Sequence, residues 1–200
     1  MSLELSKKAA AVKPSSTLAI TAKAKELKAQ GKDVVGFGAG EPDFNTPENI
    51  CEAAIKAIKD GFTKYTPASG TNELKAAISK KFKEFNGLDY DTDQIVISNG
   101  GKHSLTNIFT ALINPGDEVI IPAPFWLSYP EIVKLAGGVP VIVTTTKEQN
   151  FKLTAEDLAA AVTDKTKALV LNTPNNPTGM LYTEEELRAI AKVAVEKDFY

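Results

Sequence analysis

Hydrophobic and polar positions in the first part of the chain follow the spacing of amphipathic helices. Apolar residues recur at helical intervals over Leu18–Gln30, and they are followed by Gly31, a residue that helix C-termini favour. A second helix is predicted to run to Lys59, with Thr46 as its N-cap and Pro47 at its first position.

A third helix is predicted over Glu73–Gly87, with Thr71 or Asn72 as its cap. Lysines occupy one side of it, and large apolar residues share the other side. These apolar residues are Leu74, Ile78, Phe82 and Phe85. We therefore expect this side of the helix to pack in the core.

Further along, short apolar runs have the length and β-branched content of strands. They are QIVIS (94–98), EVIIP (118–122), GVPVIVTT (138–145) and KTKALVLN (165–172). Helical patterns lie between and after them, at 103–113, 130–137, 153–162 and 183–198. Because strands and helices alternate, the sequence predicts an α/β fold, a three-layer and mostly parallel sheet with helices on both faces.

The residues after the last helix, KDFY, resemble the start of another buried strand. We therefore expect the final strand–helix–strand unit to be incomplete and the chain to be a fragment. The alternative is a frayed helix end with a short polar tail.

Composition and charge exclude several classes of function. There are 23 basic and 25 acidic residues, so the net charge of -2 provides no basic field for nucleic acid or an anionic membrane. The sequence has no signal-peptide pattern and no apolar run of ~20 residues, and we expect a cytoplasmic protein. Cys51 and His103 are the single cysteine and histidine, too few for a disulfide or a structural zinc site, and we expect no metal.

The segment Ser98–His103 joins a predicted strand to a predicted helix and contains Gly100 and Gly101. The first amides of a helix have no acceptor within the helix, so this junction can bind an anion such as a phosphate. It does not match the nucleotide-binding P-loop pattern. The alternative is a tight turn that needs glycine for a positive φ.

Polar and aromatic residues also follow two other predicted strands. Trp126 and Tyr129 come after EVIIP, and the long loop Asn172–Gly179 follows KTKALVLN. In a parallel sheet the carboxyl ends of the strands meet at one edge, where ligands bind. We expect the three junctions to lie along that edge, although each also has a structural explanation, a packed aromatic residue or an Asx turn.

Five runs occur together in a recognisable order and spacing: AGEPDFNTPENI, KYTPASGTNELK, SNGGKHSL, PAPFWLSYPE and LNTPNNPTG. They resemble the first half of the fold-type I pyridoxal-phosphate aminotransferases of class I and II, close to the bacterial aspartate aminotransferases. The resemblance extends over nearly all 200 residues. It implies that residues 1–30 form an N-terminal arm and first helix, and that residues 31–200 are the first part of the cofactor-binding large domain.

The resemblance also implies a set of contacts to pyridoxal 5'-phosphate. The residues are Gly100, Gly101, Lys102, Trp126, Asn176 and Tyr65. The first three hold the phosphate, Trp126 stacks on the pyridine ring, and Asn176 hydrogen-bonds the phenolic oxygen. Tyr65 reaches the phosphate of the neighbouring subunit, so the resemblance implies a homodimer with shared active sites.

For the substrate, the resemblance implies that Ser16, Thr17 and Lys102 bind the distal carboxylate of aspartate. It also places Gly40, Trp126 and Asn176 beside the amino acid. An ammonium group and hydroxyl donors can bind a carboxylate where arginine is scarce, and Arg188 is the single arginine. The alternative for Lys102 is a solvated lysine at the helix start. Arg188 is expected to pair with Glu184 or Glu185 on an exposed helix face.

In the family, the Schiff-base lysine, the aspartate under the ring nitrogen and the arginine for the α-carboxylate lie beyond the matched region. We therefore assign no catalytic residue here, expect the fragment itself to be inactive, and leave open whether it binds the cofactor. The parent is expected to transfer an amino group between an amino acid, aspartate by this pattern, and a 2-oxo acid. The alternatives are an aromatic or prephenate aminotransferase, a carbon–sulfur lyase of the same fold, or a non-catalytic ligand-binding module.

Overall fold

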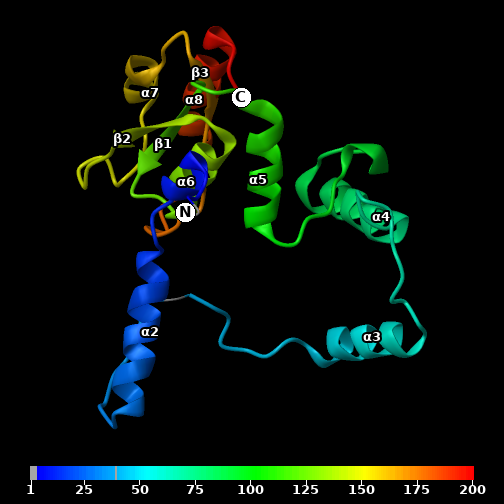
Figure 1. The fold of residues 1–200 in the computed structure, drawn as a ribbon. Helices are drawn as coiled ribbons and strands as arrows, with labels where there is room; N and C mark the ends of the chain where they lie inside the picture. The colour runs from blue at the N-terminus through cyan, green and yellow to red at the C-terminus, as the bar shows by residue number, and fades with distance from the viewer. Residues whose placement is uncertain (1–3, 39) are drawn as a thin grey trace. The chain divides into compact units, whose positions relative to one another are not determined.

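The computed structural model describes residues 4–38 and 40–200 (Figure 1). They form two compact units. One comprises Gly100–Tyr200 with the described residues up to Pro14, and the other comprises Ser15–Asn99. We call them the sheet unit and the helical unit, and describe each by itself.

The sheet unit contains three strands among the described residues, β1 (Glu118–Ala123), β2 (Val139–Thr144) and β3 (Thr166–Leu169). Their order is β2-β1-β3, and both pairings are parallel. The predicted strands at 118–122, 138–145 and 165–172 are thereby confirmed. Because β1 and β3 are parallel neighbours, the loops that follow them leave the sheet close together, at the carboxyl ends of the strands.

Helices cover both faces of this sheet. They are α5 (Gly101–Leu112), α6 (Ser128–Ala136), α7 (Ala155–Ala161) and α8 (Glu184–Lys197). The short helix α1 (Lys7–Ala10) lies against α6. Val119 and Ile121 of β1 pack with residues of α5 and α6, whereas Ile120 packs with Leu158 of α7 and Ile190 of α8. Successive strand side chains point to opposite faces, so this division confirms the predicted three-layer α/β fold.

The backbone of Tyr200 lies beside β3. Its amide donates to the carbonyl of Lys167 at 3.1 Å, and its carbonyl accepts from the amide of Leu169 at 2.8 Å. The amide of Val170, one residue further, donates instead to Ile120 of β1. Since alternate amides of a strand point to opposite edges, Tyr200 occupies the edge of β3 away from β1.

The helical unit contains α2 (Ser16–Ala29), α3 (Glu48–Lys59) and α4 (Asn72–Lys81). A π-helical turn, η1 (Phe82–Asn86), continues α4, and a 3-10 turn, η2 (Thr92–Gln94), follows it. The three helices predicted here are confirmed. The start of α3 differs by one position, because Pro47 is the N-cap and no side-chain cap bond is formed.

Two sequence expectations in this unit are wrong. The run 94–98 is not a strand: beyond the 3-10 turn, the amide of Ile97 bonds the carbonyl of Ser69 at 2.9 Å, and the described residues contain no strand beside it. A run of β-branched residues becomes a strand only where a partner pairs with it.

The expected apolar face of the third helix is not buried either. Leu74 is 47% exposed and Phe85 is 78% exposed, whereas Lys75 is buried, 8% exposed, and donates to Ser69 Oγ at 3.1 Å. The π-helical turn that begins at Phe82 widens the helix and changes the angular spacing of its side chains. The 3.6-residue period used for the prediction therefore fails at Phe85.

Candidate functional site

The start of α5 provides a group of outward-facing amides. Gly100 is its N-cap with φ +82°, a conformation that disfavours a side chain, and the carbonyl of Gly100 accepts from the amides of His103 and Ser104. The amides of Gly101 and Lys102 therefore precede the first intrahelical bonds. A Cβ placed on Gly101 would meet no atom within 4 Å, so the local fold does not require glycine there.

The loop between β1 and α6 places an indole ring next to this helix start. The ammonium nitrogen of Lys102 lies 5.3 Å from the centroid of the Trp126 ring, within the range of a cation–π contact. On another side, Tyr129 packs edge-on against the same indole, with centroids 5.4 Å apart and an interplanar angle of 86°. Tyr129 belongs to the core cluster, so it fixes the indole from the protein side.

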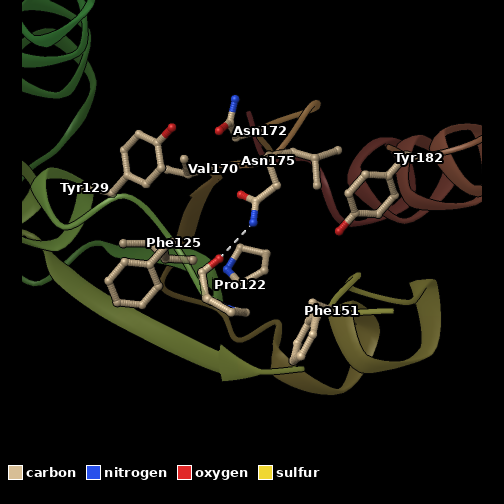
Figure 2. Close-up of a pocket in the computed structure, with 11 residues that line it drawn as sticks. Pro122, Phe125, Tyr129, Phe151, Val170, Asn172, Asn175 and Tyr182 are labelled. Atoms are coloured by element: carbon tan, nitrogen blue, oxygen red, sulfur yellow. Dashed lines mark hydrogen bonds between the residues drawn. The ribbon is translucent and has the colours of Figure 1, made fainter. Parts of the chain in front are cut away.

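The loop after β3 is tied to the loop after β1 (Figure 2). The side-chain amide of Asn175 donates to the carbonyl of Pro124 at 3.1 Å and to Thr178 Oγ1 at 2.9 Å. Within the loop, Asn172 Oδ1 accepts from the backbone amide of Asn176 at 2.9 Å. Asn172 and Asn175 thus shape the loop, whereas the exposed side chain of Asn176 has no hydrogen bond to the described residues.

A small pocket of about 10 Å³, the space of roughly one water molecule, lies between these two loops (Figure 2). Its lining combines apolar residues of β1 and of the two positions that follow β3 with Phe125, Tyr129, Asn175 and Tyr182. The Tyr129 hydroxyl is protonated at neutral pH, as in an ordinary tyrosine, and burial raises its pKa further.

The family "Aminotransferase class I and II" matches residues 32–200 of this chain. The chain belongs to the class I and II aminotransferases. It is 61% identical over 185 residues to an aspartate aminotransferase of Bacillus sp. (strain YM-2), covering 92% of this chain and 47% of that protein. It is also 54% identical to an aspartate aminotransferase of Bacillus subtilis (strain 168), covering 98% of this chain and 50% of that protein.

Solved structures agree with this assignment. The match to the aspartate aminotransferase of Thermus thermophilus with maleate has a TM-score of 0.95 and 50% sequence identity. The matched region covers 100% of this chain and 52% of that chain. The present chain therefore spans about half the length of the relatives that it matches. The resemblance inferred from its motifs is confirmed at the level of the family and of the fold.

Family membership implies pyridoxal phosphate as the cofactor, and the residues of the sheet unit fit it. The open amides of Gly101 and Lys102 suit a phosphate, the Trp126 indole suits an aromatic ring, and the Asn176 amide is available to a phenolic oxygen. The ammonium of Lys102 lies over the indole ring, so a cofactor ring stacked on that face would displace it.

The other predicted site residues lie in the helical unit. Ser16 and Thr17 begin α2, Gly40 is exposed after that helix, and Tyr65 is fully exposed before α4. Their contacts to a cofactor or substrate, and the role of Lys102 toward a distal carboxylate, stay predictions. The predicted pair of Arg188 with Glu184 is confirmed, with Nη2 2.6 Å from Oε1.

Residues 4–38 and 40–200 contain no group of three or more His, Cys, Asp or Glu side chains placed to hold a metal ion. In the same part of the chain, no helix has the length and apolar character needed to cross a membrane.

Sequence reasoning missed Asn175, which joins the loops that follow β1 and β3, and Tyr182, which lines the pocket from the far end of its loop. The pair of asparagines before Pro177 was a signal for Asn175, because one side-chain amide can fix the loop while the other stays available to a ligand. Asn175 is half-buried, and Asn176 is exposed. No pattern around Tyr182 distinguishes it from an ordinary surface tyrosine.

Proposed function

We propose that this chain is the phosphate- and ring-binding half of a pyridoxal-phosphate enzyme that moves an amino group between aspartate and a 2-oxo acid. The observation that supports it is the Lys102–Trp126 contact, which joins an amide-rich helix start to an aromatic platform at one sheet edge. The aspartate aminotransferases among its relatives support the choice of substrate.

Each residue has a defined task in this proposal. The amides of Gly101 and Lys102 bind the phosphate, Trp126 orients the ring, and Asn176 donates to the phenolic oxygen. When bound, pyridoxal phosphate supplies the carbonyl carbon that takes the amino group and a ring that accepts electrons. These residues hold the cofactor, and we propose that the proton-transferring groups belong to the rest of the longer protein.

Substrate binding involves the helical unit. Lys102 with Ser16 and Thr17 supplies donors for the distal carboxylate of aspartate, and Gly40 lets the backbone approach the amino acid. Tyr65 extends to the phosphate of a second copy, which makes the active enzyme a homodimer. We place this activity in the cytoplasm.

A second acceptor is also proposed, because a relative from Rhizobium leguminosarum bv. phaseoli that is 57% identical over 185 residues is named a probable aspartate/prephenate aminotransferase. Prephenate carries two carboxylates, as the oxo acid derived from aspartate does. The same cationic and hydroxyl donors could therefore bind its second carboxylate.

The single tryptophan makes cofactor binding directly measurable, because all indole fluorescence comes from Trp126. Titrating pyridoxal phosphate into the 200-residue chain should quench this emission. Pyridoxal, which lacks the phosphate, should need a concentration at least about tenfold higher to give the same quenching. Equal quenching by both compounds would contradict the phosphate site. For a longer product of the gene, transamination of aspartate with 2-oxo acids, including prephenate, tests the reaction and its acceptor.

A further inference from the structure

Asn176 lies in a long loop between β3 and α8, and the position of its amide depends on what holds that loop. In the first part of the loop, the side chain of Asn175 fixes the loop to Pro124. At the last residue of the loop, the backbone amide of Tyr182 donates to Thr173 Oγ1 at 3.3 Å, and this bond joins the two ends of the loop. Tyr182 is thus the last residue of the loop before the cap of α8 at Thr183.

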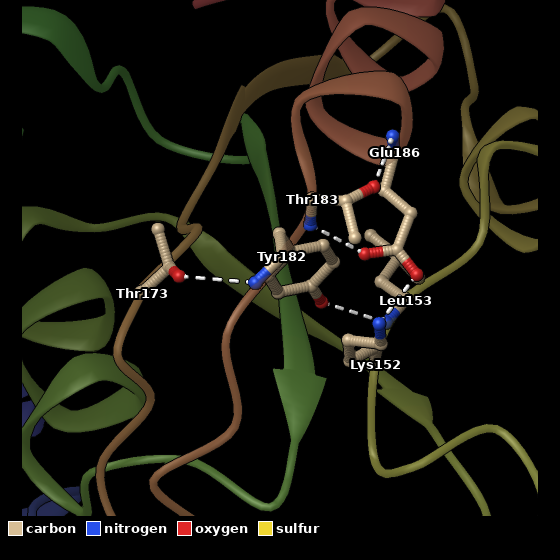
Figure 3. Close-up of polar contacts among 6 residues, drawn as sticks. All are labelled: Lys152, Leu153, Thr173, Tyr182, Thr183 and Glu186. Carbon is tan, nitrogen blue, oxygen red and sulfur yellow. Dashed lines mark hydrogen bonds and ion pairs between the residues drawn. The ribbon is translucent and has the colours of Figure 1, made fainter.

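The side chain of Tyr182 joins this loop to a third segment of the chain (Figure 3). Its hydroxyl accepts from the backbone amide of Leu153 at 2.7 Å. Leu153 is 2% exposed, and its amide needs a partner because an unpaired buried amide is costly. The hydroxyl of Tyr182 supplies that partner, while its ring also lines the pocket beside Asn175.

An ion pair lies beside the ring of Tyr182 (Figure 3). Lys152 pairs with Glu186, and its ammonium nitrogen lies 5.8 Å from the centroid of the Tyr182 ring. The second carboxylate oxygen of Glu186 accepts from the amide of Thr183 at 2.7 Å, in the capping box of α8. One carboxylate therefore connects the segment before α7 with the residue that follows Tyr182.

We propose that Tyr182 is a positioning residue that sets the place of Asn176 by anchoring the end of its loop to Leu153. This inference rests on the proposed function, because it assigns Asn176 to the cofactor. Tyr182 does not touch the cofactor in this proposal. It acts through the loop, which is held at one end by Asn175 and at the other by Tyr182.

The test compares the 200-residue chain with Tyr182→Phe, which keeps the ring and removes the bond to Leu153. Tyr90→Phe is the matched control, since Tyr90 is 42% exposed and lies in the helical unit. Amide hydrogen exchange of residues 172–181 is measured against that of β1, and pyridoxal phosphate is titrated by Trp126 fluorescence. Thr173→Val removes the other link of Tyr182 and serves as a second variant if Tyr182→Phe does not fold.

We expect exchange in residues 172–181 to rise about tenfold in Tyr182→Phe with β1 unchanged, and the cofactor dissociation constant to rise about fivefold or more. Tyr90→Phe should change neither. Unchanged exchange in the loop, an equal rise in β1, or a loosened loop with unchanged cofactor affinity would each overturn the proposal. A failure of the proposed function would be seen in a different measurement: the unsubstituted chain would show no phosphate-dependent quenching.

Discussion

The side-chain amide of Asn175 donates to the backbone carbonyl of Pro124 at 3.1 Å, across a separation of 51 residues in the sequence. This bond joins the loops that follow two neighbouring parallel strands, β1 and β3. The adjacent residue, Asn176, keeps its side chain exposed. The two consecutive asparagines therefore differ: Asn175 holds the loop, and Asn176 is the residue that we propose to contact the cofactor.

Replacing these asparagines one at a time should separate the two tasks. Asn175→Ala should lower the free energy of unfolding by about 1–2 kcal/mol, because the Pro124 carbonyl and Thr178 lose a partner. Asn176→Ala should change it by less than about 0.5 kcal/mol but weaken pyridoxal phosphate binding. Urea denaturation and Trp126 quenching measure the two quantities. Equal loss of stability in both variants would refute the division.

The two glycines at the start of α5 should also respond differently. Gly100→Ala forces a side chain into φ +82° and should cost about 1–2 kcal/mol of stability. Gly101→Ala has open space around its Cβ and should leave stability nearly unchanged, while the added methyl group hinders the approach of a phosphate. Thermal unfolding and cofactor titration distinguish them. If Gly101→Ala bound pyridoxal phosphate normally, the phosphate would have to lie elsewhere.

Loss of the ammonium at the helix start should weaken binding of the anionic cofactor. Lys102→Met should raise the dissociation constant of pyridoxal phosphate about five- to tenfold at low salt, the effect of roughly 1 kcal/mol from one charged contact. The difference should shrink as salt is added. Lys147→Met, at an exposed lysine of the same unit, is the control. If both variants bind alike, the Lys102 ammonium contributes nothing to cofactor affinity, and only its backbone amide is left for the phosphate.

The Lys152–Glu186 pair predicts a pH dependence of stability. The bond from Lys152, with the amide of Thr183, lowers the pKa of Glu186 below its ordinary 4.5. A carboxyl whose pKa is lower in the folded state stabilises the fold above its unfolded pKa and loses this contribution as pH falls through the folded value. Glu186→Gln should therefore be less stable than the unsubstituted chain at pH 7, with the gap closing as the pH is lowered below 4.5.

Urea denaturation across that pH range checks this prediction. The control is Glu196→Gln, because Glu196 lies 3.8 Å from Lys192 in an exposed pair that contributes little. The difference in unfolding free energy between Glu186→Gln and the unsubstituted chain could instead stay constant with pH. In that case the charge of the Glu186 carboxylate would not be the cause of the difference.

Much of the fold was accessible from local patterns. The apolar strand EVIIP was recognisable because strands buried on both faces are continuously hydrophobic, and Val119, Ile120 and Ile121 are fully buried. Thr183 and Glu186 form the capping box that their spacing of three allows. Motif order, too, is a property of sequence alone, and it identified the family.

Features that depend on a distant partner were decided only by the tertiary structure. Ile97 has the residue type of a strand, yet it bonds Ser69 in a turn, and the exposed Phe85 follows a π-helical turn that periodicity does not show. Likewise, the sequence predicted a strand before the junction at Gly100, where the structure has none, and it could not tell Asn175 from Asn176 or reveal the bond between Tyr182 and Leu153. Those assignments depend on which backbone groups lie opposite each side chain, and only packing of the strands and helices brings such groups together.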